Sequence, residues 1–248
     1  MKFLIPSAKQ MSGLSDGKFI ELAPASQAVL AQLGDLSTEE LSKFYDISDA
    51  QAVSEAERWQ ALVTGKAKSY PAMDLYDGLM YRQFKPVLKS DKARAFASQH
   101  VLIATALYGL IAANAPIAPH RLDFMKSLKV NGKPLKAYWK AQYDESISVN
   151  HDEVLVSLLS SEFEQVFSPT LRRRFLRIQF LEEAGGRLKR HSTISKKGRG
   201  QLLAYCIEHQ VQTLEALQAA KFDGYSYRAD LSSELDWVYV KKNREIKE

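Results

Sequence analysis

The chain has 248 residues, of which 46% are hydrophobic and 25% are charged, and its formal net charge is +5 at pH 7. This composition is ordinary for a soluble globular protein, and the length allows one large domain or two small ones, each with a proper core. No apolar run approaches the roughly 20 residues that a membrane-spanning helix needs, so the sequence excludes an integral membrane protein.

Cysteine use and the first residues predict a cytoplasmic protein. Cys206 is the only cysteine, so the chain cannot form an internal disulfide, as is typical of a reducing compartment. The apolar stretch within residues 1–10, MKFLIPSAKQ, is too short for a signal peptide, and Pro6 interrupts it. We therefore expect a cytoplasmic protein with no membrane partner, and we expect a monomer.

Charge is distributed unevenly along the chain. Residues 171–205 contain ten lysines and arginines against two acids, whereas residues 21–77 contain ten acids against four bases. A basic segment of this kind favours an anionic partner. The alternative is that both segments are simply solvated surfaces.

In chain order, the first half of the sequence predicts short strands and helices. Residues 2–7 have the pattern of a buried strand that ends in a turn. Residues 38–63 predict two helices, of which the first ends near Tyr45 and the second starts after Asp49, each with a serine or an aspartate as N-cap. The following segments are an amphipathic stretch with an internal glycine (73–84), a helix (90–100), an apolar strand that begins at 101, and a loop with two prolines (112–124).

The second half of the sequence predicts helices, a strand and two hairpins. Residues 133–147 are amphipathic and predict a helix, and residues 153–163 predict an apolar strand that runs into a turn. Apolar and polar residues alternate on both sides of EEAGG within residues 174–195, which is a strong signal for a β-hairpin. The remaining elements are a helix from about Arg199 to His209, a shorter helix near 213–220, and a second hairpin formed by YSYR and ELDWVYVKK.

No internal repeat, low-complexity tract or linker divides these elements. The economical interpretation is a single α/β (α+β) domain over residues 1–248, in which a mixed β-sheet is flanked by helices.

Common catalytic templates are absent from the sequence. It contains no Walker loop and no GxGxxG, GxSxG or HExxH motif. The histidines have no metal-ligand spacing to one another or to Cys206, so we expect no metal and no cofactor; they are His100, His120, His151, His191 and His209. Cys206 falls on the apolar side of its predicted helix, which favours core packing over a role as nucleophile.

Polar side chains follow three of the predicted strands. They are Ser7 and Lys9 after the first strand, Tyr108 and Gly109 after the strand that begins at 101, Arg121 and Asp123 in the adjoining loop, and Ser160, Ser161 and Glu162 after the strand near 154. Because ligands bind at the carboxyl ends of strands in open α/β sheets, these segments can converge on one cleft. The alternative is that they are ordinary polar loops.

Lys196, Lys197 and Arg199 gather where the predicted helix begins. The N-terminus of a helix favours anions and disfavours cations, so three cations there indicate that an anion binds between them. Gly198 and Gly200 would let the backbone approach such a ligand closely. The alternative is that the three side chains point into solvent, where salt screens their repulsion.

Seven stretches of the sequence resemble the ordered motifs of one family, and they span essentially the whole chain. They are IPSAKQM, LYDGLMYRQF, TALYGLIAANAPIAPHRLDF, AYWK, SSEFEQVF, SKKGRGQLLAYCIEH and FDGYSYRADLSSELDWVYVKK. The family that they resemble is the YaaA peroxide-stress protein family. The resemblance implies a cytoplasmic α/β protein of YaaA-like fold with a positively charged cleft. It also implies a role in surviving hydrogen peroxide and oxidative stress, lower free intracellular iron, and DNA binding, without an established reaction.

Residue by residue, the family pattern carries over onto Ser7, Lys9, Tyr76, Gly78, Tyr108, Gly109, Arg121, Trp139, Glu162, Lys196, Lys197, Arg199 and Gly200. The chain also departs from the pattern. Ala112 and Ala113 stand in the region of the usual arginine-proline pair, His120 replaces a tyrosine, and Ser157 and Ser161 stand where Asn and Asp are more frequent. These departures weaken the case for a family-wide catalytic role in this chain.

The resemblance further implies a helix-hairpin-helix DNA-binding element, for which residues 36–60 are the candidate. Such an element binds phosphate through backbone N–H groups that glycines usually expose. The turn DISD has no glycine, and residues 35–58 carry seven acids against two bases. A plain pair of helices is at least as well supported.

Three functions remain open from the sequence. The first is a DNA-binding stress protein whose cleft holds the phosphate backbone with little sequence preference, through Lys9, Arg121, Lys196, Lys197, Arg199 and Gly200. The alternative is an enzyme that acts on a nucleotide or on a base in DNA, with Ser7, Lys9, Tyr108 and Arg121 as catalytic candidates. The third is a protein-interaction or iron-handling module, for which the sequence shows no ligand cluster.

Overall fold

A mixed β-sheet forms the centre of the computed structural model, which describes residues 1–148 and 153–242. Its strands are β1 (Lys2–Pro6), β4 (Val101–Thr105), β5 (Gly109–Ala112), β9 (Leu155–Ser157), β10 (Phe175–Ala184), β11 (Arg187–Lys189), β12 (Lys221–Phe222), β13 (Tyr225–Tyr227) and β14 (Asp236–Lys242). In space they follow the order β12-β13-β14-β10-β9-β1-β4-β5, with β11 paired to β10. The middle strands from β14 to β4 run parallel, whereas β5 and β13 are antiparallel to their neighbours. The predicted α/β domain with a mixed sheet is confirmed.

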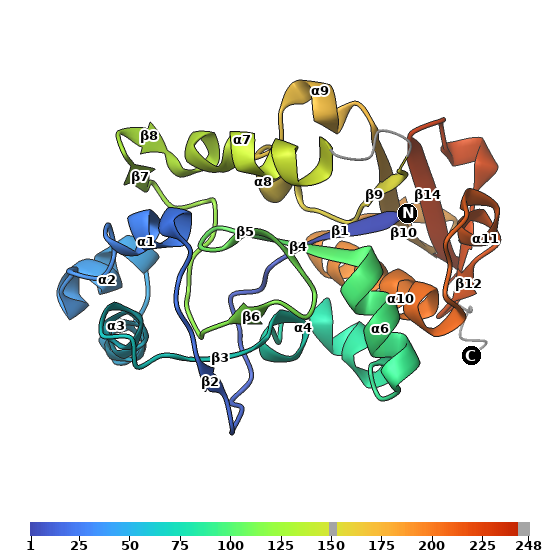
Figure 1. Cartoon of the computed structure of the whole chain (residues 1–248). Helices are drawn as coiled ribbons and strands as arrows, with labels where there is room; N and C mark the ends of the chain where they lie inside the picture. The colour runs from blue at the N-terminus through green and yellow to red at the C-terminus, as the bar shows by residue number, and fades with distance from the viewer. Residues whose placement is uncertain (149–152, 243–248) are drawn as a thin grey trace.

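Helices cover both faces of this sheet (Figure 1). The helices that pack on one face are α4 (Ala72–Leu75), α5 (Tyr81–Phe84), α6 (Asp91–His100), α10 (Ser192–His209) and α11 (Leu214–Gln218). Those that pack on the other face are α1 (Pro24–Leu30), α2 (Thr38–Tyr45), α3 (Asp49–Val63), α7 (Leu135–Ser148), α8 (Ser161–Glu164) and α9 (Pro169–Arg172). Shorter elements are β2 (Lys18–Phe19), β3 (Lys68–Pro71), β6 (Pro116–Ile117), β7 (Lys129–Val130), β8 (Lys133–Pro134), and the 3₁₀ turns η1 (Lys85–Val87) and η2 (Ala229–Leu231).

The alternation of side chains along β1 divides the hydrophobic core into two. Phe3 and Ile5 are fully buried in the core beneath α6 and α10, whereas Leu4 points into the core beneath α3 and α7. Fully burying a side chain of this size contributes about 1.5–3 kcal/mol. Because both faces of β1 are buried, its loop at the carboxyl end is held in a fixed position.

The predicted helices within residues 38–63 are present as α2 and α3, with the expected boundaries. Ser37 and Ser48 are their N-caps, and each forms a reciprocal capping box with the residue three positions later. Capping of this kind is a local interaction, so it can be read from a few consecutive residues.

The predicted start of the helix near Arg199 is wrong, because α10 begins at Ser192. The hairpin before it is present, but its second strand ends at Lys189, and the residues after it already enter the helix. The predicted loop 112–124 also contains a short strand, β6, in which Ile117 pairs with Tyr70. Lys196, Lys197 and Arg199 therefore lie more than one turn inside α10 and not at its N-terminus.

The glycines of α10 serve helix packing. A Cβ atom on Gly198 would overlap the ring of Phe180 in β10, and one on Gly200 would overlap the backbone carbonyl of Met80. The expectation that these glycines let a ligand approach is therefore wrong, because atoms of the protein itself occupy the space beside both glycines.

Candidate functional site

A cleft of about 520 Å³ opens at the carboxyl ends of β1 and β9. Three stretches of chain and two helices surround it: Pro6–Gln10, Gly78–Tyr81, Arg121–Asp123, α8 with Glu162, Phe163 and the preceding Ser160, and α10 with Thr193, Lys196 and Arg199. The segments after β1 and β9 and the loop of Arg121 and Asp123 meet here, as the strand-end rule predicts, whereas Tyr108 and Gly109 after β4 do not line the cleft.

The structure brings most of the candidate site residues onto this cleft. Those that line it are Ser7, Lys9, Arg121, Lys196 and Arg199. Lys197 is exposed and is not part of the lining, and Gly200 is buried within α10. Since α10 is a helix, consecutive residues point in different directions, and only one of the two neighbouring lysines can face the cleft.

Two carboxylates make the cleft less uniformly positive than the sequence indicates. Lys9 Nζ lies 2.8 Å from Asp123 Oδ2, and Asp123 is buried. The other carboxylate oxygen of Asp123 accepts the N–H of Met125. The Glu162 carboxylate accepts the N–H of Phe124, and burial, followed by the neighbouring Asp123, raises the pKa of Glu162 above its ordinary value. Sequence reasoning placed Asp123 in the adjoining loop and Glu162 after a strand but gave neither a role.

Arg199 carries a guanidinium that is largely buried and forms no ion pair with the described residues. Its Nε atom is inaccessible to solvent and has no hydrogen-bond partner among the described residues. Burial lowers the pKa of the Arg199 guanidinium to about 10, the neighbouring Arg190 lowers it further, and Glu164 acts in the opposite direction. A desolvated cation without a counter-ion is costly, and an anion beside it would offset that cost.

Arg121 connects the cleft to the α2–α3 pair. Its guanidinium carbon lies 5.8 Å from the centre of the Tyr45 ring, a cation–π distance. Behind it, Glu55 is buried on α3 and pairs with Arg58 at 2.7 Å. Burial raises the pKa of Glu55, while Arg58 and Arg121 lower it. The position of Arg121 thus depends on the packing of a helix far from it in sequence.

Tyr108, a catalytic candidate from the sequence, does not line the cleft. Its hydroxyl accepts the N–H of Ala118 at 2.9 Å, and burial raises the pKa of Tyr108 well above its ordinary value. The ring of His120 packs against it, with ring centres 5.1 Å apart. Both residues support the loop that presents Arg121, so their place in the structure is that of positioning residues.

A second hollow, of about 700 Å³, lies beside the segment that follows Lys9 and Gln10. Three cations line it, of which Lys18 is exposed and Lys85 and Arg94 are already paired. Arg94 forms two 3.0 Å hydrogen bonds to Asp74, and Lys85 donates to Ser12 Oγ and to the Asp74 carbonyl. Of these two cavities, the smaller one holds the largely buried guanidinium that forms no ion pair with the described residues.

The sequence also bears on metal ligands, the cysteine and membrane-spanning helices, and the structure describes most of the residues concerned. No three His, Cys, Asp or Glu side chains there form a group that could hold a metal ion, and His151 lies outside the described residues. Cys206 is buried, and burial raises the pKa of its thiol, which fits core packing. None of the helices within residues 1–148 and 153–242 is long and apolar enough to cross a membrane.

Comparison with known proteins identifies relatives along the whole chain. The family model described as peroxide stress protein YaaA matches residues 1–231. The UPF0246 protein str1967 of Streptococcus thermophilus (strain CNRZ 1066) is 44% identical over 246 residues, which are 99% of this chain and 100% of the relative. The UPF0246 protein SPN23F15130 of Streptococcus pneumoniae (strain ATCC 700669) is 48% identical over 245 residues, covering 98% of this chain and 100% of the relative. The resemblance of the sequence motifs is thus confirmed, and the chain belongs to the YaaA peroxide stress protein family.

Proposed function

We propose that this protein acts in the peroxide stress response as a monomeric cytoplasmic DNA-binding protein, and that its cleft holds the phosphate backbone with little sequence preference. The observation that carries the proposal is the convergence of Lys9, Arg121, Lys196 and Arg199 on one cleft, where Arg199 forms no ion pair with the described residues. Guanidinium and ammonium groups are the usual donors to phosphate oxygens.

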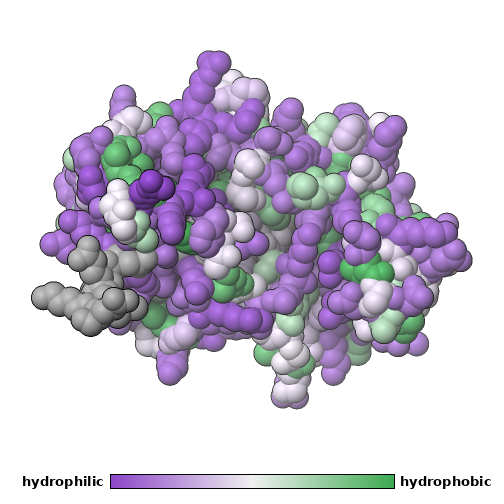
Figure 2. All heavy atoms as spheres, turned by 180° about the vertical axis from the view of Figure 1, so that it is seen from behind, coloured by the Kyte–Doolittle hydropathy of each residue, from purple (hydrophilic) through white to green (hydrophobic). Residues whose placement is uncertain are grey.

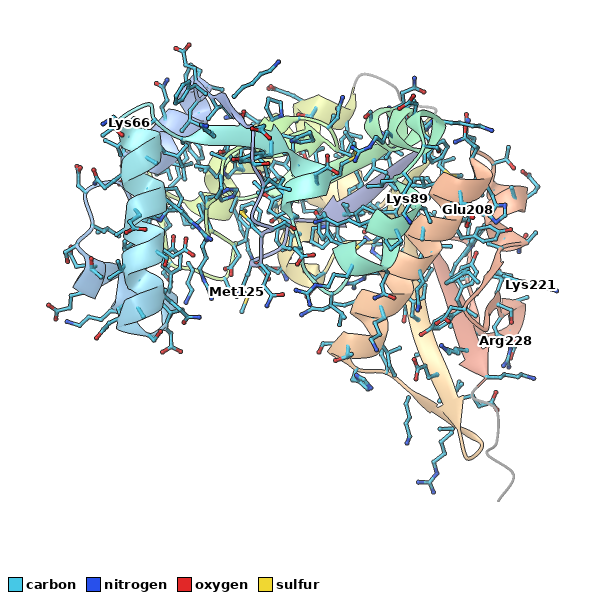
Figure 3. All side chains as sticks on the ribbon, turned by 90° about the horizontal axis from the view of Figure 1, so that it is seen from below. Lys66, Lys89, Met125, Glu208, Lys221 and Arg228 are labelled. Atoms are coloured by element: carbon cyan, nitrogen blue, oxygen red, sulfur yellow. The ribbon has the colours of Figure 1, made fainter. Side chains whose placement is uncertain are left out.

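The basic segment of the sequence extends this surface beyond the cleft. The β10–β11 hairpin projects from the body of the molecule, with nitrogen-tipped side chains near its turn (Figure 3). Arg187, Lys189 and Arg190 are exposed there, and the chain then enters α10, which carries Lys196 and Arg199. A continuous run of cations is the electrostatic footprint expected for a nucleic-acid backbone.

The α2–α3 pair receives no phosphate contact in this proposal. In its turn, the N–H groups of Asp46 and Ile47 both donate to the Ser42 carbonyl, and the N–H of Ser48 donates to the Gln51 side chain. These backbone donors are already used within the protein, so the geometry favours a plain pair of helices over a phosphate-binding hairpin.

A protein-interaction module is the less favoured reading of the surface. Hydrophilic residues dominate the face shown in Figure 2, and the hydrophobic ones stand there in small groups. Interaction sites for partner proteins more often show a broad apolar patch. The enzyme alternative has one supporting observation, the pair of acids Asp123 and Glu162 within the cleft.

Fluorescence anisotropy with a labelled duplex tests the proposed function. If about three to five phosphates are contacted, the affinity should fall with salt at a log–log slope of about −3 to −4. The double variant K196Q/R199Q should bind about tenfold or more weakly, because two charge-assisted contacts are lost. The variant K66Q/K89Q is the matched control, since both lysines are exposed and lie off the cleft (Figure 3). Salt-independent binding, or no binding at low salt, would contradict the proposal.

The role in peroxide stress and the effect on free iron are tested in cells. A strain lacking the protein should lose viability in hydrogen peroxide, accumulate DNA damage and hold more free iron. The wild-type gene should restore survival, and the K196Q/R199Q gene should not, because the proposal makes protection depend on the cleft. Full rescue by the variant would separate peroxide protection from DNA binding.

A further inference from the structure

The cleft is too small to enclose a DNA duplex. Its volume of about 520 Å³ falls within the range of small-molecule sites, roughly 300–1,000 Å³. A duplex, whose major groove alone is about 12 Å wide, can lie across the opening but cannot enter it. A ligand that enters the cleft must therefore be smaller than a duplex that lies across its opening.

The two walls of the cleft differ in chemistry. The α10 wall presents Lys196 and Arg199, and the Nε of Arg199 has no hydrogen-bond partner among the described residues. The wall formed by residues 121–123 and α8 presents Asp123 and Glu162. The ligand that suits both walls has an anionic end and a second end that donates hydrogen bonds.

The acidic wall keeps an acceptor free for a ligand. Asp123 uses Oδ2 for Lys9 and Oδ1 for the N–H of Met125. Glu162 uses Oε1 for the N–H of Phe124, and its Oε2 accepts no hydrogen bond from the described residues. A ligand that is anionic throughout, such as a polyphosphate, would meet repulsion from the Glu162 carboxylate, whereas the charge of Asp123 is compensated by Lys9.

Apolar atoms complete the lining between the two walls. Leu79, Met80, Leu122 and Phe163 contribute them. Flat aromatic heterocycles are bound in this manner, between apolar side chains and beside a few polar groups that fix their orientation.

We propose that the cleft is a pocket for one nucleotide whose base carries an exocyclic amino group, with the 5′-phosphate on Lys196 and Arg199 and the amino group on Glu162. The nucleotide is either free or extruded from DNA, and only the second case rests on the proposed function. Thymine fits less well, because the carbonyl oxygens on both sides of its N–H would face the carboxylate.

Calorimetric titration with dAMP, dCMP, dGMP, dTMP and 2-deoxyribose 5-phosphate tests the pocket. The three amino-bearing nucleotides should bind about fivefold or more tightly than dTMP, as a hydrogen bond to a charged group implies. R199Q should weaken all five probes about tenfold or more, since each carries the phosphate. E162Q should reduce the amino-bearing nucleotides to the level of dTMP. K66Q/K89Q serves as control, and thermal unfolding of each variant verifies folding.

A duplex with a single mismatched 2-aminopurine distinguishes the two sources of the nucleotide. Its fluorescence rises when the base leaves the stack, so a rise on binding wild type, reduced in R199Q, assigns the pocket to extruded nucleotides. Binding of the mononucleotides without a rise assigns it to free nucleotides.

Two results would overturn the inference. The first is no binding of any mononucleotide together with no fluorescence rise. The second is equal binding of all four nucleotides that E162Q leaves unchanged. If duplex binding persists in either case, the proposed function stands without the pocket. Mononucleotide binding without duplex binding would overturn the proposed function and leave the pocket standing.

Discussion

Arg199 shows how one residue can link stability to ligand binding. Its guanidinium lines the cleft from α10 and is desolvated without forming an ion pair within the described residues. Such a group costs free energy in the empty protein and recovers it when an anion arrives. The exposed neighbour Lys197 lacks both features, which makes it the natural comparison.

We expect R199Q to unfold in phosphate-free buffer at the same or a higher urea concentration than wild type, because the uncompensated charge is gone. Inorganic phosphate should stabilise wild type and K197Q by about 1–2 kcal/mol at ten to thirty times its dissociation constant, and R199Q much less. Urea unfolding with and without phosphate measures both effects. Marked destabilisation of R199Q without phosphate would show instead that the guanidinium is a structural element.

His120 is the residue whose burial has a consequence for pH. It is almost fully buried, its Nδ1 lies 2.8 Å from the Ala118 carbonyl, and burial lowers the pKa of its imidazole to about 4. The ring is therefore neutral in the folded protein at pH values at which the unfolded chain, with an ordinary pKa near 6.5, already binds a proton.

The sign of the effect follows from this difference. Between about pH 6.5 and pH 4 the unfolded state holds more protons, so stability falls as the pH falls, by about 3 kcal/mol in total. We expect His120→Gln to remove that part of the pH dependence while leaving the contribution of all other groups. Urea unfolding of both proteins at pH 7, 5.5 and 4 gives the difference; parallel curves would mean that the pKa of His120 is the same in the folded and unfolded chains.

At the scale of elements, the sequence predicts well what is determined locally. The boundaries of α2 and α3 follow from capping residues within a few positions, and the β10–β11 hairpin follows from alternation around Gly185 and Gly186, both with positive φ. The start of α10 cannot be predicted from the local sequence, because Gly198 and Gly200 lower the helix propensity of this segment. The contacts that require these glycines are with Phe180 and Met80, which lie elsewhere in the chain.

The sequence likewise predicts some features of the candidate site and not others. Ser7, Lys9 and Arg121 can be found from the sequence because polar residues at strand ends meet at one edge of a parallel sheet. Three other features of the site cannot be found from the sequence: the exposure of Lys197, the pairing of Lys9 with Asp123 and the burial of Tyr108. They depend on the rotation of a helix and on contacts between distant segments.

Packing at α10 gives the prediction for this scale. Alanine usually stabilises a helix relative to glycine by about 1 kcal/mol, yet Gly198→Ala and Gly200→Ala should each lower the free energy of unfolding by about 1–3 kcal/mol. The added Cβ would meet the Phe180 ring or the Met80 carbonyl, and the carbonyl cannot rotate away. Chemical denaturation measures the change. Ser195→Ala on the same helix is the control and should be neutral or slightly stabilising. If Gly198→Ala and Gly200→Ala leave the free energy of unfolding unchanged, α10 can shift to accommodate the added Cβ atoms.

For the molecule as a whole, charge is separated between two regions. The acidic helices α2 and α3 belong to one core, whereas the basic hairpin β10–β11 leads directly into α10 of the other. Figure 3 shows the hairpin and α3 at opposite ends of the molecule. A bound duplex should therefore extend from the cleft toward the hairpin, away from α3.

The salt dependence of duplex binding tests this orientation, because the slope counts the phosphates that are contacted. Each lost phosphate contact should reduce the slope by about 0.9. We expect R187Q/K189Q to reduce it by about 2, since both side chains are exposed near the hairpin turn. The matched variant E39Q/E57Q, on the acidic helices, should keep the wild-type slope and bind equally well or slightly more tightly, because it removes long-range repulsion and, at Glu39, only an exposed ion pair with Lys43. An unchanged slope in R187Q/K189Q would confine the DNA to the cleft, and weaker binding by E39Q/E57Q would place it on the α2–α3 side.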